Sequence, residues 1–192
     1  IVINWCINKC CIKINFNKRI RFIKIEIINL KKREIYKNIN IMEYNKKNVL
    51  KNVKKSWKKI LKDNLVENKL KEVEEDRLKY LNKKKILPEP YLVFNAFKHF
   101  ELNDLKVVLL GQDPYIRYEL HNDKIIPQAM GLAFSVPKEI KKIPPSLKNI
   151  FKELKNNIKG FDIPNNGDLT RWVKEENILL LNSALTVIEG KS

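Results

Sequence analysis

Two continuous apolar runs mark the C-terminal half of the chain. The first is KVVLL at 106–110 and the second is ILLLNSALTV at 178–187. Short apolar runs of this kind predict strands that are buried on both faces of a parallel sheet. The carboxyl ends of parallel strands meet at one edge of the sheet, where functional residues gather. Asp113 and Asn182 stand at these ends, so we expect them to face one crevice.

Helical spacing is found before the first run and between the two runs. From 53 to 80 the pattern predicts a helix, whose first apolar face consists of Val53, Trp57, Ile60 and Leu61. A second helix is predicted over 147–158, with Ser146 as its N-cap and Gly160 after its end. Asp168 is placed to cap a short third helix that carries Trp172.

Prolines and aromatic residues separate the first helix from the first strand. Pro88 and Pro90 end the helical pattern because proline has no amide donor and constrains the residue before it. Four aromatic side chains follow, and we predict that all of them pack into the core: Tyr91, Phe94, Phe97 and Phe100.

These elements predict an α/β fold with a central parallel sheet flanked by helices. Two core strands are too few for such a sheet, so we expect a further C-terminal part after Ser192. We assign residues 46–192 to the N-terminal portion of this domain. Residues 1–45 are rich in Ile, Lys and Asn, and we expect a disordered extension, although IRFIKIEI alternates like a strand. A tail that follows DNA phosphates is the alternative for this stretch.

Composition adds little to this picture. The net charge of +17 comes from 39 Lys and Arg against 22 Asp and Glu. Such a charge permits a polyanionic partner, but the Lys, Asn and Ile bias is also what A/T-rich coding DNA produces. The three cysteines, Cys6, Cys10 and Cys11, suit neither a disulfide framework nor a zinc site and are expected to be free thiols. No apolar run has the length of a membrane span, and we expect a soluble, intracellular protein.

The motifs at the strand ends are more specific. GQDPY (111–115) is followed by QAMGLAFSV (128–136), PPSLKNIFKEL (144–154) and GDLTRWVKEENILLLNSALTV (167–187). In order, spacing class and chemistry these segments resemble the family 1 uracil-DNA glycosylases. SWKKIL (56–61) and PEPYLVFNAF (88–97) resemble the segments that precede the first strand in that family.

The resemblance implies a metal-free monomer without cofactors that removes uracil from single- or double-stranded DNA and does not act at membranes. Cleavage of the glycosidic bond passes through an oxocarbenium-like sugar. Asp113 would stabilise this cation and orient a water molecule. The flipped base is read in a pocket, which implies roles for Gln112 (backbone facing O2), Tyr115 (excluding the thymine methyl group), Phe134 (stacking) and Asn182 (hydrogen bonds to N3–H and O4). Pro144, Pro145 and Ser146 would press on the DNA backbone. Taken singly, the same residues are ordinary turn, cap and core residues.

The chain departs from the family pattern in two places. Ile116 and Met130 stand where the family has histidines, and an eleven-residue insertion occupies 117–127. His121 lies within the insertion and could replace a lost histidine; the insertion itself is either a surface loop or translated non-coding sequence. The His-Pro-Ser-Pro loop of the family, whose histidine stabilises the leaving uracil, does not occur in the sequence.

Two functions follow from these departures. The first is a uracil-DNA glycosylase of base-excision repair, represented by an incomplete chain that we expect to be unstable or inactive by itself. The alternative is a non-catalytic remnant that binds uracil-containing DNA. DNA repair would place the protein in the nucleus, or in a mitochondrion or another organelle with its own genome.

Overall fold

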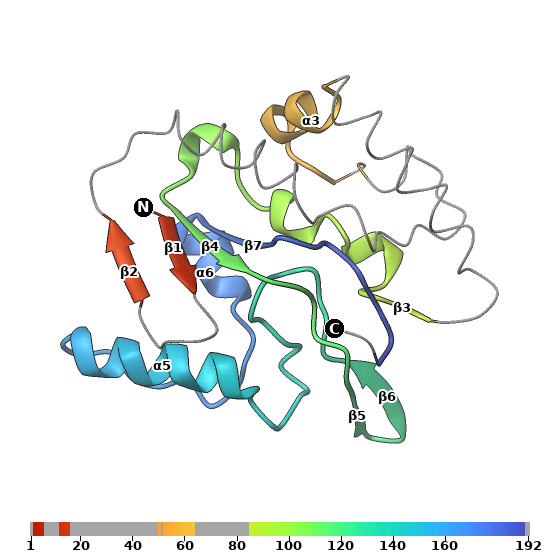
Figure 1. Cartoon of the computed structure of the whole chain (residues 1–192), viewed down its shortest axis with the longest axis vertical. Coiled ribbons are helices and arrows are strands. Elements are labelled where there is room, and N and C mark those ends of the chain that lie inside the picture. Colours follow the sequence, from red (N-terminus) through yellow and green to blue (C-terminus); the bar gives the residue numbers. More distant parts are fainter. Residues whose placement is uncertain (1, 6–11, 16–49, 51, 64–84, 191–192) are drawn as a thin grey trace.

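The computed structural model of the chain describes residues 2–5, 12–15, 50, 52–63 and 85–190. Its main sheet has four strands in the order β2-β1-β4-β7 (Figure 1). These are β1 (Val2–Trp5), β2 (Ile12–Asn15), β4 (Val107–Gly111) and β7 (Ile178–Asn182). β4 pairs in parallel with β7 and with β1, whereas β1 and β2 are antiparallel. The predicted parallel sheet and the α/β class are confirmed.

The second predicted strand is shorter than expected. β7 ends at Asn182, and the chain then turns before β8 (Val187–Ile188), which pairs with β3 (Ile86–Leu87) in a separate two-stranded sheet. The apolar run therefore contributes one strand to each of two sheets, and Asn182 lies at the turn between these strands.

The N-terminal residues supply β1 and β2. Both strands come from the stretch that we expected to be a disordered extension. The alternating segment IRFIKIEI, the three cysteines and the remainder of that stretch lie outside the described residues, as do 64–84 of the first predicted helix. The disordered extension stays a prediction for those residues.

Helices cover the sheet. α3 (Lys55–Leu61) is the described part of the first predicted helix, α5 spans Pro145–Asn157, and α6 spans Thr170–Glu176. Figure 1 shows α5 running along one end of the sheet and α6 behind β4. None of the helices among the described residues is long and apolar enough to span a membrane.

The predicted N-cap of α5 is wrong. Pro144 has the extended backbone of an N-cap, and its carbonyl accepts the Lys148 N–H at 3.0 Å. Pro145 is the first helical residue, a position where its fixed φ suits the helix. Ser146 is the second, and its side chain makes no cap hydrogen bond. The predicted cap of α6 is shifted by one residue. Leu169 is the N-cap and makes no side-chain cap, whereas Asp168 Oδ1, one residue earlier, accepts the Thr170 N–H at 2.8 Å.

The aromatic segment forms three short 3-10 turns: η2 (Pro90–Leu92), η3 (Asn95–Phe97) and η4 (Leu102–Asp104). Phe94, Phe97 and Phe100 are buried as predicted, but Tyr91 is 65% exposed, so its assignment to the core is wrong. The segment is a series of separate turns, and three-residue spacing does not keep one face inward across them.

The insertion folds as a β-hairpin. β5 (Tyr118–His121) pairs with β6 (Lys124–Pro127) through the register Tyr118↔Pro127 to His121↔Lys124. Asn122 and Asp123 form the two-residue connection, and both have positive φ (49° and 58°). A type I′ turn requires positive φ at both positions, and Asn and Asp tolerate it.

Candidate functional site

The candidate site is built where β4 and β7 end. The register places Gly111, the last residue of β4, beside Asn182, the last residue of β7. A Cβ atom on Gly111 would lie 2.3 Å from Asn182 Oδ1 and 3.1 Å from Ala133 Cβ. The Asn182 side chain therefore occupies the space that a larger residue would need. Asn182 is also one of the few buried polar residues of the described core, at 9% exposure.

The turns that follow the two strands are hydrogen-bonded to each other. The Ser183 N–H donates to the Gly111 carbonyl at 2.9 Å, and the Ala184 N–H donates to the Gln112 carbonyl at 2.9 Å. The Ser183 hydroxyl also donates to the Gln112 carbonyl, at 2.6 Å. Residues 71 and 72 positions apart in the chain thus form one rigid rim, which the sequence did not reveal because serine is common in any turn.

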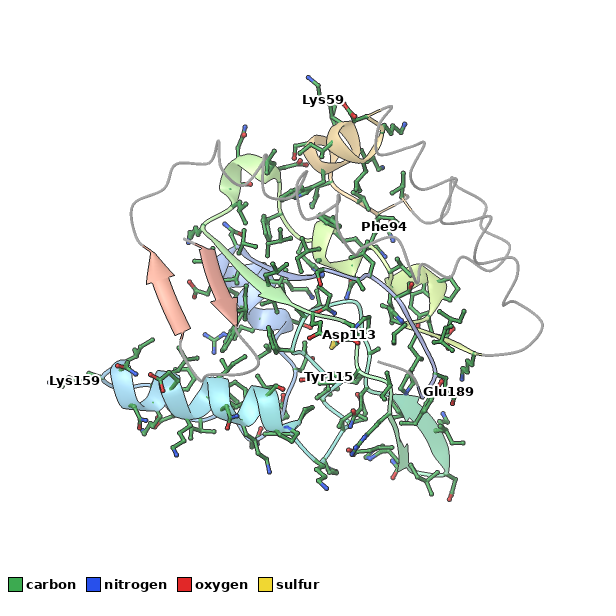
Figure 2. The ribbon with its side chains drawn as sticks, in the orientation of Figure 1. Lys59, Phe94, Asp113, Tyr115, Lys159 and Glu189 are labelled. Atoms are coloured by element: carbon green, nitrogen blue, oxygen red, sulfur yellow. The ribbon has the colours of Figure 1, made fainter. Side chains whose placement is uncertain are left out.

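Asp113 lies on this rim, next to the end of β4, with Tyr115 close by (Figure 2). Its side chain is half-buried, and this burial raises the pKa of the Asp113 carboxyl above its usual range, although a backbone hydrogen bond partly opposes the shift. The buried Pro114 follows and fixes the backbone of the turn. A carboxylate with reduced hydration interacts strongly with a positive charge that develops beside it.

Phe134 is held near the same edge by bonds to two elements. The neighbouring Ala133 N–H donates to the Leu180 carbonyl of β7 at 3.1 Å, and the Tyr115 hydroxyl donates to the Phe134 carbonyl at 3.3 Å. Phe134 has a φ of +64°, a conformation that is rare for a bulky residue and costs about 1–3 kcal/mol. Strained residues of this kind gather at functional sites.

The interior position of the Tyr115 phenol has an electrostatic consequence. Burial raises the pKa of the Tyr115 hydroxyl well above its usual range. Tyr115 is therefore a neutral, fixed side chain that links the turn after β4 to the Phe134 segment. Four of the predicted site residues are thus connected through β4 and β7: Asp113, Tyr115, Phe134 and Asn182.

Met130, which stands where the family has a histidine, makes packing contacts within the fold. The Met130 carbonyl accepts from Asn95 Nδ2 at 2.9 Å, and its sulfur lies 3.0 Å from the hydroxyl of the fully buried Ser135. Gly131 follows with a φ of +74°, and a Cβ atom there would lie 1.8 Å from the Leu92 carbonyl oxygen. His121 is the last residue of β5 and pairs with Lys124 across the turn.

The predicted DNA-backbone residues lie on a separate element. Pro144, Pro145 and Ser146 form the start of α5, where Pro144 is buried, Pro145 is exposed and Ser146 is half-buried. In the part of the chain that the structure describes, no group of three or more His, Cys, Asp or Glu residues could hold a metal ion.

Comparison with known proteins identifies relatives of the chain. No protein-family model matches it. It is 50% identical over 141 residues to a uracil-DNA glycosylase of Borrelia duttonii (strain Ly), which covers 72% of the chain and 58% of the relative. It is 44% identical over 138 residues to the corresponding protein of Campylobacter concisus (strain 13826), covering 72% of the chain and 55% of the relative.

A solved structure shares the fold. The crystal structure of mimivirus uracil-DNA glycosylase superposes with a TM-score of 0.60 and 27% identity, over 81% of the chain and 57% of that structure. The named relatives come from bacteria and from mimivirus, so they give no support to a nuclear location. The chain spans less than two thirds of the length of these relatives, at 58% of the Borrelia duttonii protein. Over the matched residues, the chain is similar in sequence and in fold to uracil-DNA glycosylases.

Proposed function

We propose that the protein hydrolyses the N-glycosidic bond between uracil and deoxyribose in DNA, with Asp113 as its catalytic carboxylate. The main support is the pairing of Gly111 with Asn182, because it joins a base-reading amide and a half-buried carboxylate at one sheet edge. The similarity to uracil-DNA glycosylases adds to this support. The alternative of a non-catalytic remnant that binds uracil-containing DNA is tested by the same experiment.

In the proposed reaction the bond between C1′ and N1 breaks, and its electron pair leaves with uracil as an anion. The sugar acquires oxocarbenium character, which the Asp113 carboxylate stabilises. Asp113 also orients the water whose oxygen adds to C1′, and the proton that this water loses neutralises the uracil anion, which completes the hydrolysis. Only the ionised form of Asp113 stabilises a cation. Catalysis by Asp113 therefore requires a pH above the raised pKa of its carboxyl.

Base selection is assigned to the Asn182 amide. Its oxygen accepts from uracil N3–H and its NH2 group donates to O4, whereas cytosine presents the opposite donor and acceptor at these positions. A polar site that must leave such groups unpaired rejects the wrong base strongly. The close contact with Gly111 restricts the amide, which supports a fixed orientation.

The remaining pocket roles follow the geometry. Phe134 stacks on the uracil ring, and Tyr115, which is bonded to the Phe134 carbonyl, excludes the 5-methyl group of thymine. Uracil O2 requires a donor, and the Gln112 carbonyl already accepts from Ser183 and Ala184. The Gln112 backbone N–H is therefore the group that we assign to O2.

The start of α5 is assigned to the DNA backbone. Pro145 is exposed and would press on the strand beside the flipped nucleotide, and the buried Pro144 would fix the backbone behind it. Ser146 makes no side-chain cap, so its hydroxyl and the helix N–H groups are suited to a phosphate oxygen. A monomeric state, and a location in the nucleus or an organelle, stay predictions.

Uracil release from a single-stranded oligonucleotide tests the proposal. We expect the full-length form of the protein to release uracil and Asp113→Asn to lower its rate by roughly 10²–10³-fold, the usual effect of removing one electrostatic group from an active site. Burial raises the pKa of Asp113 in the folded state. The ionised carboxylate is therefore less stable in the folded protein than in the unfolded chain, and the fold loses stability as the pH rises from the unfolded pKa through the raised folded pKa. Asp113→Asn should therefore not lower the melting temperature at pH 7, which separates loss of catalysis from loss of fold.

Three results would decide against parts of the proposal. Equal release by the wild type and by Asp113→Asn would remove Asp113 from the mechanism. Binding that prefers uracil-containing DNA without any release would favour the remnant. Absence of both release and uracil preference in the full-length form would contradict the proposed function.

A further inference from the structure

The β5–β6 hairpin carries the two most exposed large apolar side chains of the described residues. Leu120 and Ile125 are each 72% exposed. The register pairs them directly across the two strands, so they form one apolar patch. We call residues 120–125, which contain this pair and the turn, the hairpin tip.

The base of the hairpin is hydrogen-bonded to and packed against the rest of the protein. At its base the Gln128 N–H donates to the Arg117 carbonyl at 2.9 Å. Tyr118 packs against the buried cluster of Leu87, Ala129 and Val187, and Lys85 Nζ lies 4.8 Å from the centre of its ring. The apolar tip therefore projects from an anchored base.

A carboxylate joins the hairpin to the segment that leads into α5. Glu119 Oε1 accepts from Gln128 Nε2 at 3.4 Å, and its Oε2 accepts the Lys141 backbone N–H at 3.1 Å. Lys141 precedes Pro144 by three residues. The hairpin and the proline segment are thus held side by side.

The proposed catalytic residue is close along the chain. Tyr118 follows Asp113 by five positions, and an extended chain of this length spans at most about 18 Å. Figure 1 shows the hairpin projecting from the molecule beyond the end of β4. The hairpin is therefore connected to Asp113 through the chain and to the segment before α5 through Glu119.

The charge around the tip suits a polyanion. The hairpin exposes Arg117 and Lys124, and the adjoining segment exposes Lys138, Lys141 and Lys142. Acidic residues in the same two segments are fewer: Glu119, Asp123 and Glu139, of which Glu119 is bonded as described. Basic side chains around an apolar pair are typical of proteins that contact DNA phosphates and also pack against unstacked bases.

We propose that the hairpin tip contacts duplex DNA beside the uracil. Leu120 and Ile125 pack against the base step that opens when the nucleotide flips, and Arg117 and Lys124 contact the flanking phosphates. This inference rests on the proposed function. It gives a role to a segment that lies between two of the site motifs.

Binding to a labelled duplex tests the hairpin tip. The duplex carries one 2′-fluoro-2′-deoxyuridine, whose bond resists hydrolysis because fluorine destabilises the oxocarbenium state. The double variant Leu120→Ser, Ile125→Ser should raise the Kd of the chain about tenfold, as expected for the loss of contact with one base. The matched control is Ile158→Ser, Ile163→Ser, which alters two other exposed isoleucines (50% and 53%) and should leave the Kd within about twofold of the wild type.

Salt dependence provides a second measurement. Arg117→Gln and Lys124→Gln should each reduce the slope of log K against log salt by about 0.9, the value for one phosphate contact. Circular dichroism should be unchanged in all these variants, because the altered side chains are exposed.

Specific outcomes would overturn the inference. Equal duplex affinity in the wild type and the Leu120→Ser, Ile125→Ser variant would remove the tip from the DNA interface. A wild-type dimer in sedimentation that this variant dissociates would instead identify a second copy as the occupant of the patch. Failure of the proposed function is recognised separately, because the wild type would then show no preference for the uracil analogue over thymidine in the same duplex.

Discussion

Gly111 shows how a single position can determine the geometry of the site. It carries no functional group, yet a Cβ atom there would lie 2.3 Å from Asn182 Oδ1. Real Cβ atoms do not approach another heavy atom so closely, and the backbone of β4 is fixed by parallel pairing on both sides. Any side chain at this position must therefore displace the amide that we assign to base selection.

Replacing Gly111 with alanine tests this dependence. We expect Gly111→Ala to move the Asn182 amide and to reduce the preference for uracil over cytosine by about tenfold or more, since each misplaced hydrogen bond costs about 1–3 kcal/mol. Relative affinity for single-stranded oligonucleotides that carry one or the other base measures the effect.

Gly160→Ala is the matched control for this prediction. Gly160 has a φ of +82° and no atom within 4 Å of its Cβ position, so alanine strains the backbone without touching the site. It should lower the melting temperature and leave base preference unchanged. A Gly111→Ala protein with wild-type preference would show that Asn182 is positioned by other contacts.

The residues of the site were predictable to different degrees. Asp113 and Asn182 could be placed together because both end apolar runs, and parallel strands align their carboxyl ends. The positive φ of Phe134 could not be predicted, because a bulky residue adopts it only when surrounding contacts impose it. Ser146 was assigned as a cap from its residue type, but the proline before it is better suited to the first helical position.

At the scale of elements, α3 is held by a carboxylate from a distant part of the chain. Glu101 accepts the backbone N–H of Ser56 at 2.9 Å and of Lys55 at 3.3 Å, and it also accepts the Ser56 hydroxyl. These donors belong to the first turn of α3, which lacks a side-chain cap at Lys54. This cap could not be predicted from the sequence, because Glu101 lies 46 residues after Lys55, the first residue of α3.

Glu101→Gln should destabilise the fold in a pH-dependent way. The hydrogen bonds from Ser56, its hydroxyl first, lower the pKa of Glu101 in the folded state. The stabilisation by the carboxylate is then fully present above its unfolded value of about 4.3 and disappears as the pH falls through the lower folded value. The difference in melting temperature between the wild type and Glu101→Gln should be largest at neutral pH and shrink below about pH 4.

The control for Glu101→Gln is another surface glutamate. Glu175 pairs with the exposed Arg171 at 2.6 Å, and such pairs contribute little. Glu175→Gln should leave the melting temperature almost unchanged at all pH values. A pH-independent difference for Glu101→Gln would contradict the cap assignment.

The hairpin was within reach of sequence reasoning, but its signal was weak. Asn122 and Asp123 are suited to a type I′ turn, yet the flanking strands place Leu120 and Ile125 in solvent. This arrangement removes the alternation by which a half-buried strand is recognised. β4 and β7 were easier to predict, because strands that are buried on both faces consist of continuous apolar runs.

At the scale of the whole molecule, one aromatic cluster joins α3 to the sheet. Trp57 of α3 is 1% exposed, and its ring meets Phe97 and Phe100 edge-on at centroid distances of 5.3 and 6.3 Å. Its Nε1 donates to the Phe100 carbonyl at 2.9 Å. The same core cluster includes residues of β4, α5 and β7. The contribution of α3 to stability therefore depends on this side chain more than on its seven-residue helix.

Trp57→Ala should lower the free energy of unfolding by about 3–5 kcal/mol, through the lost burial and the cavity that remains. Urea unfolding monitored by circular dichroism measures this change. Tyr91→Ala removes an aromatic ring of the same aromatic segment, but Tyr91 is 65% exposed, and the expected change is within about 0.5 kcal/mol. Because mutant and control differ chiefly in burial, similar losses for both would mean that α3 does not pack on the described core in solution. A large loss of stability for Trp57→Ala alone would show that this core extends from the sheet to α3.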